Sequence, residues 1–412
     1  MLEKGLGMNK IVAVLCLALA VSVFAQVNSK IEYSEKYADV DYVGDGKAFH
    51  TLDIYLPKEV KDSYPVVIHT YGGAWSVNNA KSTADLNTIC AALLNAGYAV
   101  VTPNHRAASD AVYPAQLHDI KAVVRFVRGN AAKFKFDTTF VAASGFSSGG
   151  HLSSLVATTC GLEEGKSGSV TVDLVGNLGE FTQYSSCVDA ASLWSAPTDI
   201  YTMIPIKNQM AGKSGTFEGA FIGVERDGHK DKWMVASSPY YASEDDPPII
   251  MFHGTKDQIV NIEQSEELYD SLKKCNVVTE RIVVEGGTHG GNEMYVDLTL
   301  NKMVEFLNTA HANKVASMTA SVGDSPYSVK VDFLKRLSRD YTPLAQIGLI
   351  GDKLVAYGTG KVRFAIVSMN GARAWRGSFR GSLNLSALPS GVYAAVVTFQ
   401  SGMQKSLKFA KK

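Results

Sequence analysis

The segment FVAASGFSSGGHL, residues 140–152, is the most informative part of the sequence about the fold. It opens with a short apolar run typical of a buried strand, and residues 151–159 have the apolar periodicity of a helix. Between the two lies the G-x-S-x-G sequence of residues 145–149. A strand that turns sharply into a helix at this motif forms a nucleophile elbow, with Ser147 on the turn. The alternative interpretation is an ordinary serine-rich loop.

The sequence around this motif predicts an α/β fold. Residues 49–306 alternate short apolar runs with helical periodicity. Leu52, Ile54 and Leu56 alternate with polar neighbours as in a half-buried strand. Buried parallel strands are predicted at Pro65–Tyr71, Tyr98–Pro103, Thr139–Ser144, Ala190–Trp194, Ile249–His253 and Arg281–Val284. Helices are expected at about 84–96, 115–129, 149–158, 263–274 and 293–309. We therefore expect a mostly parallel sheet flanked by helices.

The elbow serine needs a base, and that base needs an acid to orient it. In folds with this elbow the chain order is serine, acid, histidine. Asp257 follows the predicted strand 249–254, and His289 lies in the glycine-rich segment 285–290 after the next strand. Because parallel strands end at one edge of the sheet, both loops should reach Ser147. The order predicts Ser147 as nucleophile, His289 as base and Asp257 as acid.

Several polar residues offer alternatives to this arrangement. Asp246 and Glu285 are weaker candidates for the acid, because neither directly follows a strand, and His289 could be an ordinary loop histidine. Four other histidines raise a metal hypothesis: His105, His118, His151 and His253. They fall on predicted strand ends and helices, where structural histidines are the better interpretation. We expect no metal and no cofactor.

An oxyanion hole requires backbone N–H donors from a glycine-rich loop early in the sheet. The sequence YGGAW, residues 71–75, directly follows a predicted strand and supplies such a loop. We predict Gly73, Ala74 and Ser148 as the donors. Trp75 is either a substrate-binding wall of the acyl pocket or an ordinary core aromatic.

Residues 31–310 resemble the α/β-hydrolase esterases related to hormone-sensitive lipase, above all the BD-FAE-like bacterial branch that includes feruloyl and acetylxylan esterases. The matching pieces are YGGAW (71–75), NHR (104–106), YPAQLHDIKA (113–122), GFSSGGHL (145–152), PTD (197–199), HGTKD (253–257) and GGTHGG (286–291). The resemblance implies the α/β-hydrolase fold and the same Ser147, Asp257 and His289 triad. One position departs from the pattern: relatives usually carry histidine where this chain has Tyr71.

The chain has 412 residues and a formal net charge of zero, which argues against a nucleic-acid binder. The charge is unevenly divided, however. Residues 26–310 carry 23 basic and 35 acidic side chains, whereas residues 311–412 carry 15 basic and 4 acidic ones. We expect a hydrolase domain at 26–310, a linker at 311–343 and a small β module at 344–412.

The β module resembles the C-terminal sorting domains of bacteria that use type IX secretion. The resemblance rests on VRFAIVSMNG (362–371), LPSGVY (388–393) and the two terminal lysines. Strand-like runs also occur at 349–357, 383–385 and 393–399, and Asn370-Gly371 predicts a hairpin. A carbohydrate-binding or stabilising module is the alternative.

The N-terminal residues 1–25 have the features of a secretory signal peptide: a lysine, the apolar run Ile11–Phe24 and a small-residue cleavage site. No later segment is long and apolar enough to span a bilayer. Export makes a disulfide plausible, and Cys160 and Cys187 flank a glycine- and serine-rich insertion. We expect these two to be paired, the alternative being two free thiols.

Together these features predict a secreted or cell-surface serine carboxylesterase. The resemblance implies acetyl or feruloyl groups on plant cell-wall xylan as substrate. A serine peptidase on the same fold and a non-catalytic glycan-binding protein remain alternatives. Segments 160–187 and 200–236 are expected to form a cap. Five aromatic residues either line an aromatic-accepting site or belong to the core: Trp194, Tyr201, Phe217, Phe221 and Trp233.

Overall fold

The computed structural model describes residues 31–83, 85–205 and 215–323 of the first part of the chain. In the C-terminal region it describes residues 346–350, 353–357, 362–368, 374–379, 382–386, 388–398 and 404–411. The chain divides into two compact units after Gly323. The predicted signal peptide and residues 324–343 of the expected linker lie outside the described residues.

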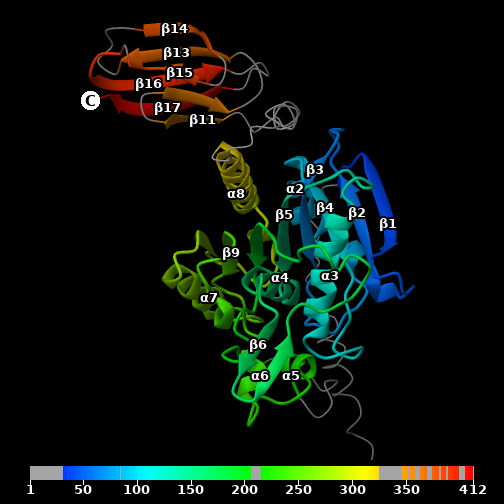
Figure 1. The fold of residues 1–412 in the computed structure, drawn as a ribbon. Helices are drawn as coiled ribbons and strands as arrows, with labels where there is room; N and C mark the ends of the chain where they lie inside the picture. Colours follow the sequence, from blue (N-terminus) through cyan, green and yellow to red (C-terminus); the bar gives the residue numbers. More distant parts are fainter. Residues whose placement is uncertain are drawn as a thin grey trace, which may run out of the picture. The chain divides into compact units, whose positions relative to one another are not determined.

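An eight-stranded sheet forms the centre of the first unit, with strand order β1-β2-β4-β3-β5-β8-β9-β10 (Figure 1). The strands are β1 (Glu35–Asp41), β2 (Thr51–Leu56), β3 (Tyr64–Thr70), β4 (Ala99–Pro103), β5 (Phe136–Phe146), β8 (Ala190–Trp194), β9 (Ile249–Gly254) and β10 (Thr279–Val284). All pairs from β4 to β10 are parallel, whereas β2 pairs antiparallel with both β1 and β4. The six predicted parallel strands are therefore confirmed.

Helices follow the strands much as the periodicity predicts. They are α2 (Ala91–Asn95), α3 (Ala115–Gly129), α4 (Ser148–Thr158), α5 (Phe217–Ile222), α6 (Lys230–Met234), α7 (Glu263–Lys274) and α8 (Asp297–Gly323). Short 3-10 helices are η1 (Ala48–His50), η2 (Lys81–Thr83), η5 (Ser238–Tyr241) and η6 (Asn292–Met294), and η3 (Leu86–Cys90) is a π-helix directly before α2. None of the described helices is long and apolar enough to cross a membrane.

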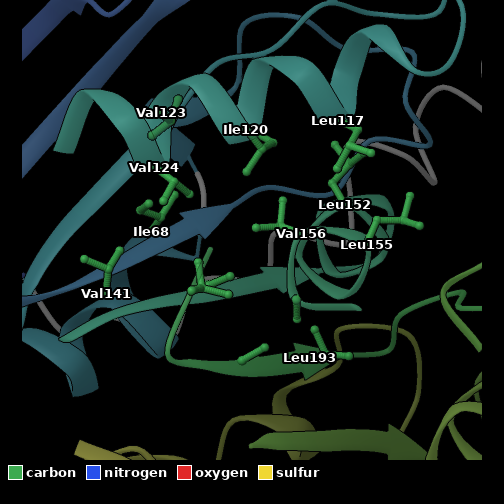
Figure 2. Packing of buried hydrophobic residues seen from close by; sticks show 14 of the residues in the cluster. Ile68, Leu117, Ile120, Val123, Val124, Val141, Leu152, Leu155, Val156 and Leu193 are labelled. Carbon is green, nitrogen blue, oxygen red and sulfur yellow. The ribbon is translucent and has the colours of Figure 1, made fainter. Parts of the chain in front are cut away.

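Two apolar layers hold the sheet between helices. On one face, α3 and α4 pack on the central strands through Leu117, Ile120, Val123, Val124, Leu152, Leu155 and Val156, which meet Ile68, Val141 and Leu193 (Figure 2). On the other face, α2 and α8 cover Val67, Val100 and Ala142. Each fully buried aliphatic side chain contributes about 1.5–3 kcal/mol. Because both faces are covered, the parallel strands are apolar almost throughout.

Strand β2 differs from its prediction. The alternation of Leu52, Ile54 and Leu56 suggested one wet face, but the intervening Asp53 and Tyr55 are also buried. Asp53 is compensated by ion pairs with Lys36 and with Lys81, whose side chain is itself buried. A buried charge in a strand is tolerated only with such partners, and the partners lie far from Asp53 in sequence.

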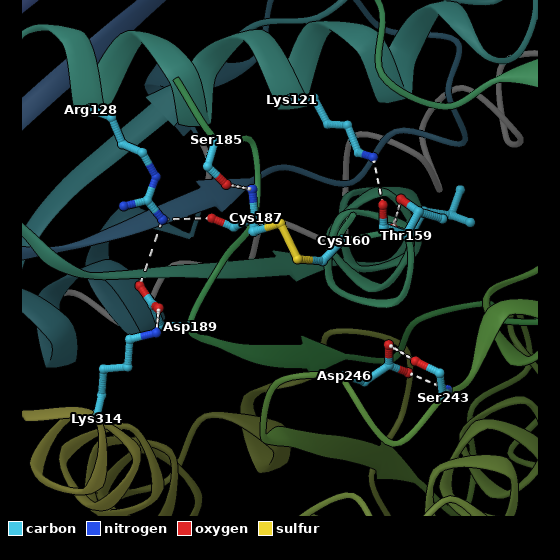
Figure 3. Close-up of a disulfide and its surroundings, with 11 residues drawn as sticks. Lys121, Arg128, Thr159, Cys160, Ser185, Cys187, Asp189, Ser243, Asp246 and Lys314 are labelled. Carbon is cyan, nitrogen blue, oxygen red and sulfur yellow. Dashed lines mark hydrogen bonds and ion pairs between the residues drawn. A yellow bond between two sulfur atoms is a disulfide. The ribbon is translucent and has the colours of Figure 1, made fainter. Parts of the chain in front are cut away.

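The insertion after α4 is closed by the predicted disulfide between Cys160 and Cys187 (Figure 3). It contains the hairpin of β6 (Glu164–Ser167) and β7 (Val170–Asp173). Two basic side chains of α3 bind the backbone at its two ends: Lys121 Nζ donates to the carbonyl of Thr159, directly before Cys160, at 3.0 Å, and an Arg128 nitrogen donates to that of Cys187 at 2.7 Å. The insertion is therefore fastened to the α3 side of the core.

The start of the expected linker is helical, because α8 continues to Gly323 rather than ending near residue 309. The second unit contains two antiparallel sheets, with strand orders β11-β12-β15 and β14-β13-β16-β17. Its strands are β11 (Gln346–Ile350), β12 (Lys353–Tyr357), β13 (Val362–Ser368), β14 (Ala374–Phe379), β15 (Ser382–Asn384), β16 (Gly391–Thr398) and β17 (Gln404–Lys411). Strand β13 pairs antiparallel with β14, whereas the strand-like run expected after Asn370-Gly371 was 383–385.

Candidate active site

Strand β5 turns directly into α4 at Ser147, as the motif predicts. The residue has φ 52° and ψ −126°, a conformation rarely adopted by residues other than glycine. The flanking glycines are required by space: a Cβ on Gly145 would collide with the backbone of Gly149, and one on Gly149 with the carbonyl of Thr70. A backbone hydrogen bond of 2.8 Å from Ser147 N to the Trp194 carbonyl ties the turn to β8.

The three residues predicted as a triad lie together. Nε2 of His289 is 3.0 Å from Oγ of Ser147, and Nδ1 of His289 is 2.8 Å from Oδ2 of Asp257. An ionised carboxylate only accepts hydrogen bonds, so Nδ1 of the neutral ring carries the proton. Nε2 is then free to accept the proton of the serine hydroxyl, which is the arrangement that general-base activation of a serine requires.

Asp257 is held in its charged form. Burial opposes ionisation of this carboxyl, but hydrogen bonds from His253 and His289 and a backbone N–H outweigh it and lower its pKa. His253 Nε2 donates to the carbonyl of Val260 at 2.9 Å and lies 3.5 Å from Asp257 Oδ2. The N–H groups of Ile259 and Val260 each donate to Oδ1 at 2.9 Å, which fixes the carboxylate plane.

The loop after β3 lies against the elbow. A Cβ on Gly72 would stand 2.9 Å from Cβ of Ser147, so the two backbones approach closely. In the described part of the chain, the N–H groups of Gly73 and Ala74 have no hydrogen-bond acceptor. The N–H of Ser148 is in the first turn of α4, where no intrahelical acceptor exists. The three predicted donors are thus available near the nucleophile.

Tyr71 and Trp75 flank these donors, and both are buried. The Tyr71 hydroxyl donates to the carbonyl of Val77 at 3.0 Å, and its ring stacks on His105 with centroids 4.9 Å apart. Tyr71 thus joins the start of the loop to its end. Trp75 is 2% exposed and stacks on Phe221 of α5, which favours the core role over a pocket wall.

The alternatives considered for the triad lie elsewhere. Asp246 binds the backbone N–H and hydroxyl of Ser243, and burial raises the pKa of Asp246 to about 6. Glu285 accepts from Thr255. Each of the four further histidines hydrogen-bonds to a backbone carbonyl: His105 to Arg106, His118 to Asp173, His151 to Ala236 and His253 to Val260. The described residues contain no group of side chains suited to hold a metal ion.

The segments expected as a cap contact each other and the loop after β3. Ser167 of β6 donates to Asp231 of α6, and Phe221 of α5 stacks on Trp75 of the loop after β3. Tyr240, just beyond the second segment, donates its hydroxyl to the carbonyl of Lys166. Three of the five aromatic residues, Trp194, Phe221 and Trp233, are buried in the core, while Tyr201 and Phe217 are half-buried. Residues 206–214 of the expected cap lie outside the described residues.

The comparisons with known proteins identify the family of this chain. A family model described as BD-FAE matches residues 52–272, more than half of the chain and within the first unit. This chain belongs to the BD-FAE family. The resemblance derived from the sequence motifs is confirmed.

Solved structures with a related sequence include carbohydrate esterases. A truncated carbohydrate esterase from gut microbiota is 37% identical to this BD-FAE chain with a TM-score of 0.65, covering 69% of this chain and 99% of that one. A bifunctional GH43-CE protein of Bacteroides eggerthii is 38% identical with a TM-score of 0.63, covering 67% and 35%. Esterase 2 of Thermogutta terrifontis is 22% identical with a TM-score of 0.51, and it shares the fold over 68% of this chain and 96% of that one.

The curated relatives are more distant. A probable carboxylic ester hydrolase of Mycobacterium tuberculosis, LipM, is 26% identical over 240 residues, which cover 58% of this chain and 52% of LipM. Esterase LipQ of the same organism is 25% identical over 250 residues, or 60% and 55%. The matches thus span about half the length of these curated relatives.

Sequence reasoning missed two contacts of this BD-FAE site. His253 Nε2 lies 3.5 Å from Asp257 Oδ2, and the indole Nε1 of Trp75 donates to Nδ1 of His151 at 3.2 Å. The interpretation of both histidines as structural is compatible with these contacts, but it did not connect them to the site. The positions of His253, directly before Gly254, and of His151, one helical turn after Ser147, were the available signals.

Proposed function

We propose that this chain is a serine carboxylesterase that removes acyl groups through an acyl-enzyme. The observation that carries the proposal is the pair of hydrogen bonds from Asp257 through His289 to Ser147 at the strand-to-helix turn. The esterase names of the relatives support the same reaction class. All three residues belong to the first unit, to which the proposed activity is assigned.

In the first step, Ser147 Oγ attacks the ester carbonyl carbon while His289 Nε2 takes the hydroxyl proton. The electron pair of the C=O double bond moves to oxygen and gives a tetrahedral oxyanion. Asp257 stabilises the imidazolium and keeps its ring oriented. The N–H groups of Gly73, Ala74 and Ser148 would bind the oxyanion. Removing one such donor typically reduces kcat by about 10²–10³-fold.

In the second step, the tetrahedral intermediate expels the alkoxide, which receives the proton from His289. This leaves an ester of the acyl group with Ser147 and a neutral imidazole. A water molecule then enters where the alcohol left, gives a proton to His289 Nε2 and attacks the acyl carbon. Collapse of the second intermediate releases the acid and returns the proton to Ser147.

For the substrate we propose acylated plant polysaccharide, with acetyl or feruloyl groups on xylan. The support is the carbohydrate-esterase description of two related structures together with the family. We also propose export, because disulfides such as Cys160–Cys187 persist mainly in oxidising compartments. The C-terminal β unit is proposed as a sorting domain for type IX secretion.

The test is the release of acetate and ferulate from acylated xylo-oligosaccharides by the wild type and by Ser147→Ala. Release of either acid by the wild type alone supports the esterase and identifies its acyl group. Cleavage of a generic short-chain ester without release of either acid would refute the xylan substrate and leave the reaction class standing. Equal activity of Ser147→Ala would refute the mechanism.

A further inference from the structure

The loop that carries two of the proposed oxyanion donors has a strained backbone. Two successive non-glycine residues, Ala74 and Trp75, have φ 50° and 55°, in the left-handed region. Residues other than glycine rarely adopt that conformation, because their Cβ then lies too close to the following carbonyl oxygen. A strained backbone persists only where surrounding contacts fix it, and such strain is common at functional sites. The contacts that fix these two residues therefore control the direction of the loop's N–H groups.

Contacts on both sides hold Trp75. Its carbonyl accepts a 2.7 Å hydrogen bond from the N–H of Ala108, and its ring stacks on Phe221 with centroids 4.7 Å apart. Its indole Nε1 donates to Nδ1 of His151 at 3.2 Å. Of these three contacts, only the last reaches the helix that begins at the nucleophile.

His151 is suited to receive this bond in one tautomer. Its Nε2 lies 2.8 Å from the carbonyl of Ala236, which can only accept, so Nε2 carries the ring proton. Nδ1 is then an acceptor, as the indole N–H requires. Burial of the ring lowers the pKa of His151 to about 4 and keeps it neutral near pH 7. The Trp75 bond thus has a donor and an acceptor whose roles are fixed.

We propose that His151 is a positioning residue for the oxyanion hole, which it serves by anchoring Trp75. The inference rests on the proposed function. Helix α4 supplies one donor, the N–H of Ser148, in its first turn. His151 lies on the same helix, and its N–H makes the 3.0 Å bond to the Ser147 carbonyl. Through the hydrogen bond between His151 and Trp75, helix α4 therefore positions the N–H groups of Gly73 and Ala74 relative to the N–H group of Ser148.

This anchor is distinct from the one provided by Tyr71. The Tyr71 hydroxyl binds Val77, beyond the strained residues, and so closes the loop without reaching α4. His151 joins the loop to the nucleophile helix, and through Ala236 it also joins both to the segment that follows α6. Loss of the His151 contact should therefore reduce transition-state stabilisation more than substrate binding.

Two substitutions at His151 separate its two hydrogen bonds. Asparagine places its terminal atoms near the position of Nδ1 and can still accept from Trp75, whereas glutamine reaches the position of Nε2 and keeps the bond to Ala236. We expect His151→Gln to lower kcat by about 10–100-fold, below the loss of a whole donor, with KM changed by less than about 3-fold. His151→Asn should lose less, about 3-fold. Trp75→Phe, which keeps the stack on Phe221, should behave like His151→Gln.

A second readout identifies the oxyanion hole as the affected part. A thionoester places the developing charge on sulfur, a weak hydrogen-bond acceptor, so its hydrolysis depends less on the N–H donors. The ratio of ester to thionoester turnover should fall in His151→Gln and Trp75→Phe and remain near the wild-type ratio in His118→Gln. His118 is the matched control, because it also binds one backbone carbonyl, that of Asp173.

The hydrogen bond itself is measured without catalysis, by solvent exchange of the Trp75 indole N–H in ¹⁵N-labelled protein. Exchange should be faster in His151→Gln than in the wild type or His151→Asn. Unchanged exchange, unchanged kcat in His151→Gln, or an equal loss in both His151 variants would overturn the inference. A wild type that cleaves no ester would instead refute the proposed function, and the exchange measurement would still decide whether His151 anchors Trp75.

Discussion

Two hydrogen-bonded Ser–His–Asp arrays contain serines that are only three residues apart, Ser144 in β5 and Ser147 directly after it. In the first, at the end of the strand, His289 joins Ser147 at 3.0 Å to Asp257 at 2.8 Å. In the second, within the strand, His69 of β3 lies 3.0 Å from Oγ of Ser144 and 2.9 Å from Oδ2 of Asp85. By residue type and distance alone, the two arrays are nearly the same.

Their surroundings differ. Ser144 and His69 are fully buried, and Ser144 lies in regular strand conformation between β3 and β8. Ser147 is 9% exposed and stands on the turn at the N-terminus of α4, beside N–H groups that have no acceptor in the described chain. The ring of His69 is also reversed, because its Nε2 rather than Nδ1 faces the carboxylate. Access and oxyanion donors, rather than the hydrogen-bonded trio, distinguish a candidate active site.

Removal of each serine should give the largest difference in activity between the two arrays. We expect Ser147→Ala to lower kcat on the order of 10⁶-fold, as loss of a serine nucleophile does elsewhere, and Ser144→Ala to change it less than about 3-fold. Hydrolysis of a p-nitrophenyl ester measures both. If Ser144→Ala lost as much activity at unchanged folding, the buried array would belong to the mechanism.

The carboxylates provide the next largest contrast. Asp257→Asn should lower kcat at neutral pH by about 10⁴-fold, because an amide favours the wrong histidine tautomer. Asp85→Asn, facing His69, should leave kcat within about 3-fold. Steady-state kinetics at pH 7 compare the two variants, and a small effect of Asp257→Asn would contradict its assignment as the acid.

The two histidines should rank in the opposite order for stability: loss of His69 should destabilise the protein more than loss of His289. His69→Leu leaves a buried hydroxyl and a carboxylate without their partner and should lower the free energy of unfolding by about 2–3 kcal/mol. His289→Leu should cost less stability, since this side chain is partly exposed, while abolishing ester hydrolysis. Urea unfolding of both variants is the measurement, and the opposite ranking would refute the structural role of the buried array.

The smallest effect concerns acid stability. Because the pKa of Asp257 is lower in the folded protein than in the unfolded chain, its contribution to stability is present above the unfolded value of about 4. The stabilising contribution of Asp257 should be lost progressively as the pH falls below about 4. In acid unfolding curves, Asp257→Asn should therefore lose less stability than the wild type below about pH 4. Parallel curves would show that the carboxylate is not stabilised in the fold.

Sequence reasoning predicts the first array and misses the second for a physical reason. The elbow at Ser147 is local, since glycines, strand and helix are contiguous, and the fold's chain order supplies Asp257 and His289. The second array depends on the register of β3 against β5, which pairs His69 with Ser144, and on Asp85 adopting φ 47°. No short sequence motif predicts the register of these strands or the backbone conformation of Asp85.

The same limit applies to other parts of the chain. Trp75 and His151 are 76 residues apart, and their contact depends on how the loop after β3 meets α4. Strands β14 and β17 were not predicted, because AWRGSF and QKSLKFAK contain several basic and small polar residues and lack a clear apolar alternation. Apolar strands such as β8 and β9 and the amphipathic helix α3 were, by contrast, predicted to within one residue, whereas α8 extends well beyond its predicted end.

Covalent labelling tests directly whether Ser147, rather than Ser144, is the nucleophile. The protein is treated with a fluorophosphonate ester, digested with trypsin and sequenced by fragmentation mass spectrometry. The peptide between Lys135 and Lys166 contains both Ser144 and Ser147, so its fragments separate the two arrays in one spectrum. If Ser147 is the nucleophile, one adduct forms, on Ser147, and none forms in Ser147→Ala. An adduct on Ser144 or outside this peptide, or equal labelling of Ser147→Ala, would contradict this assignment.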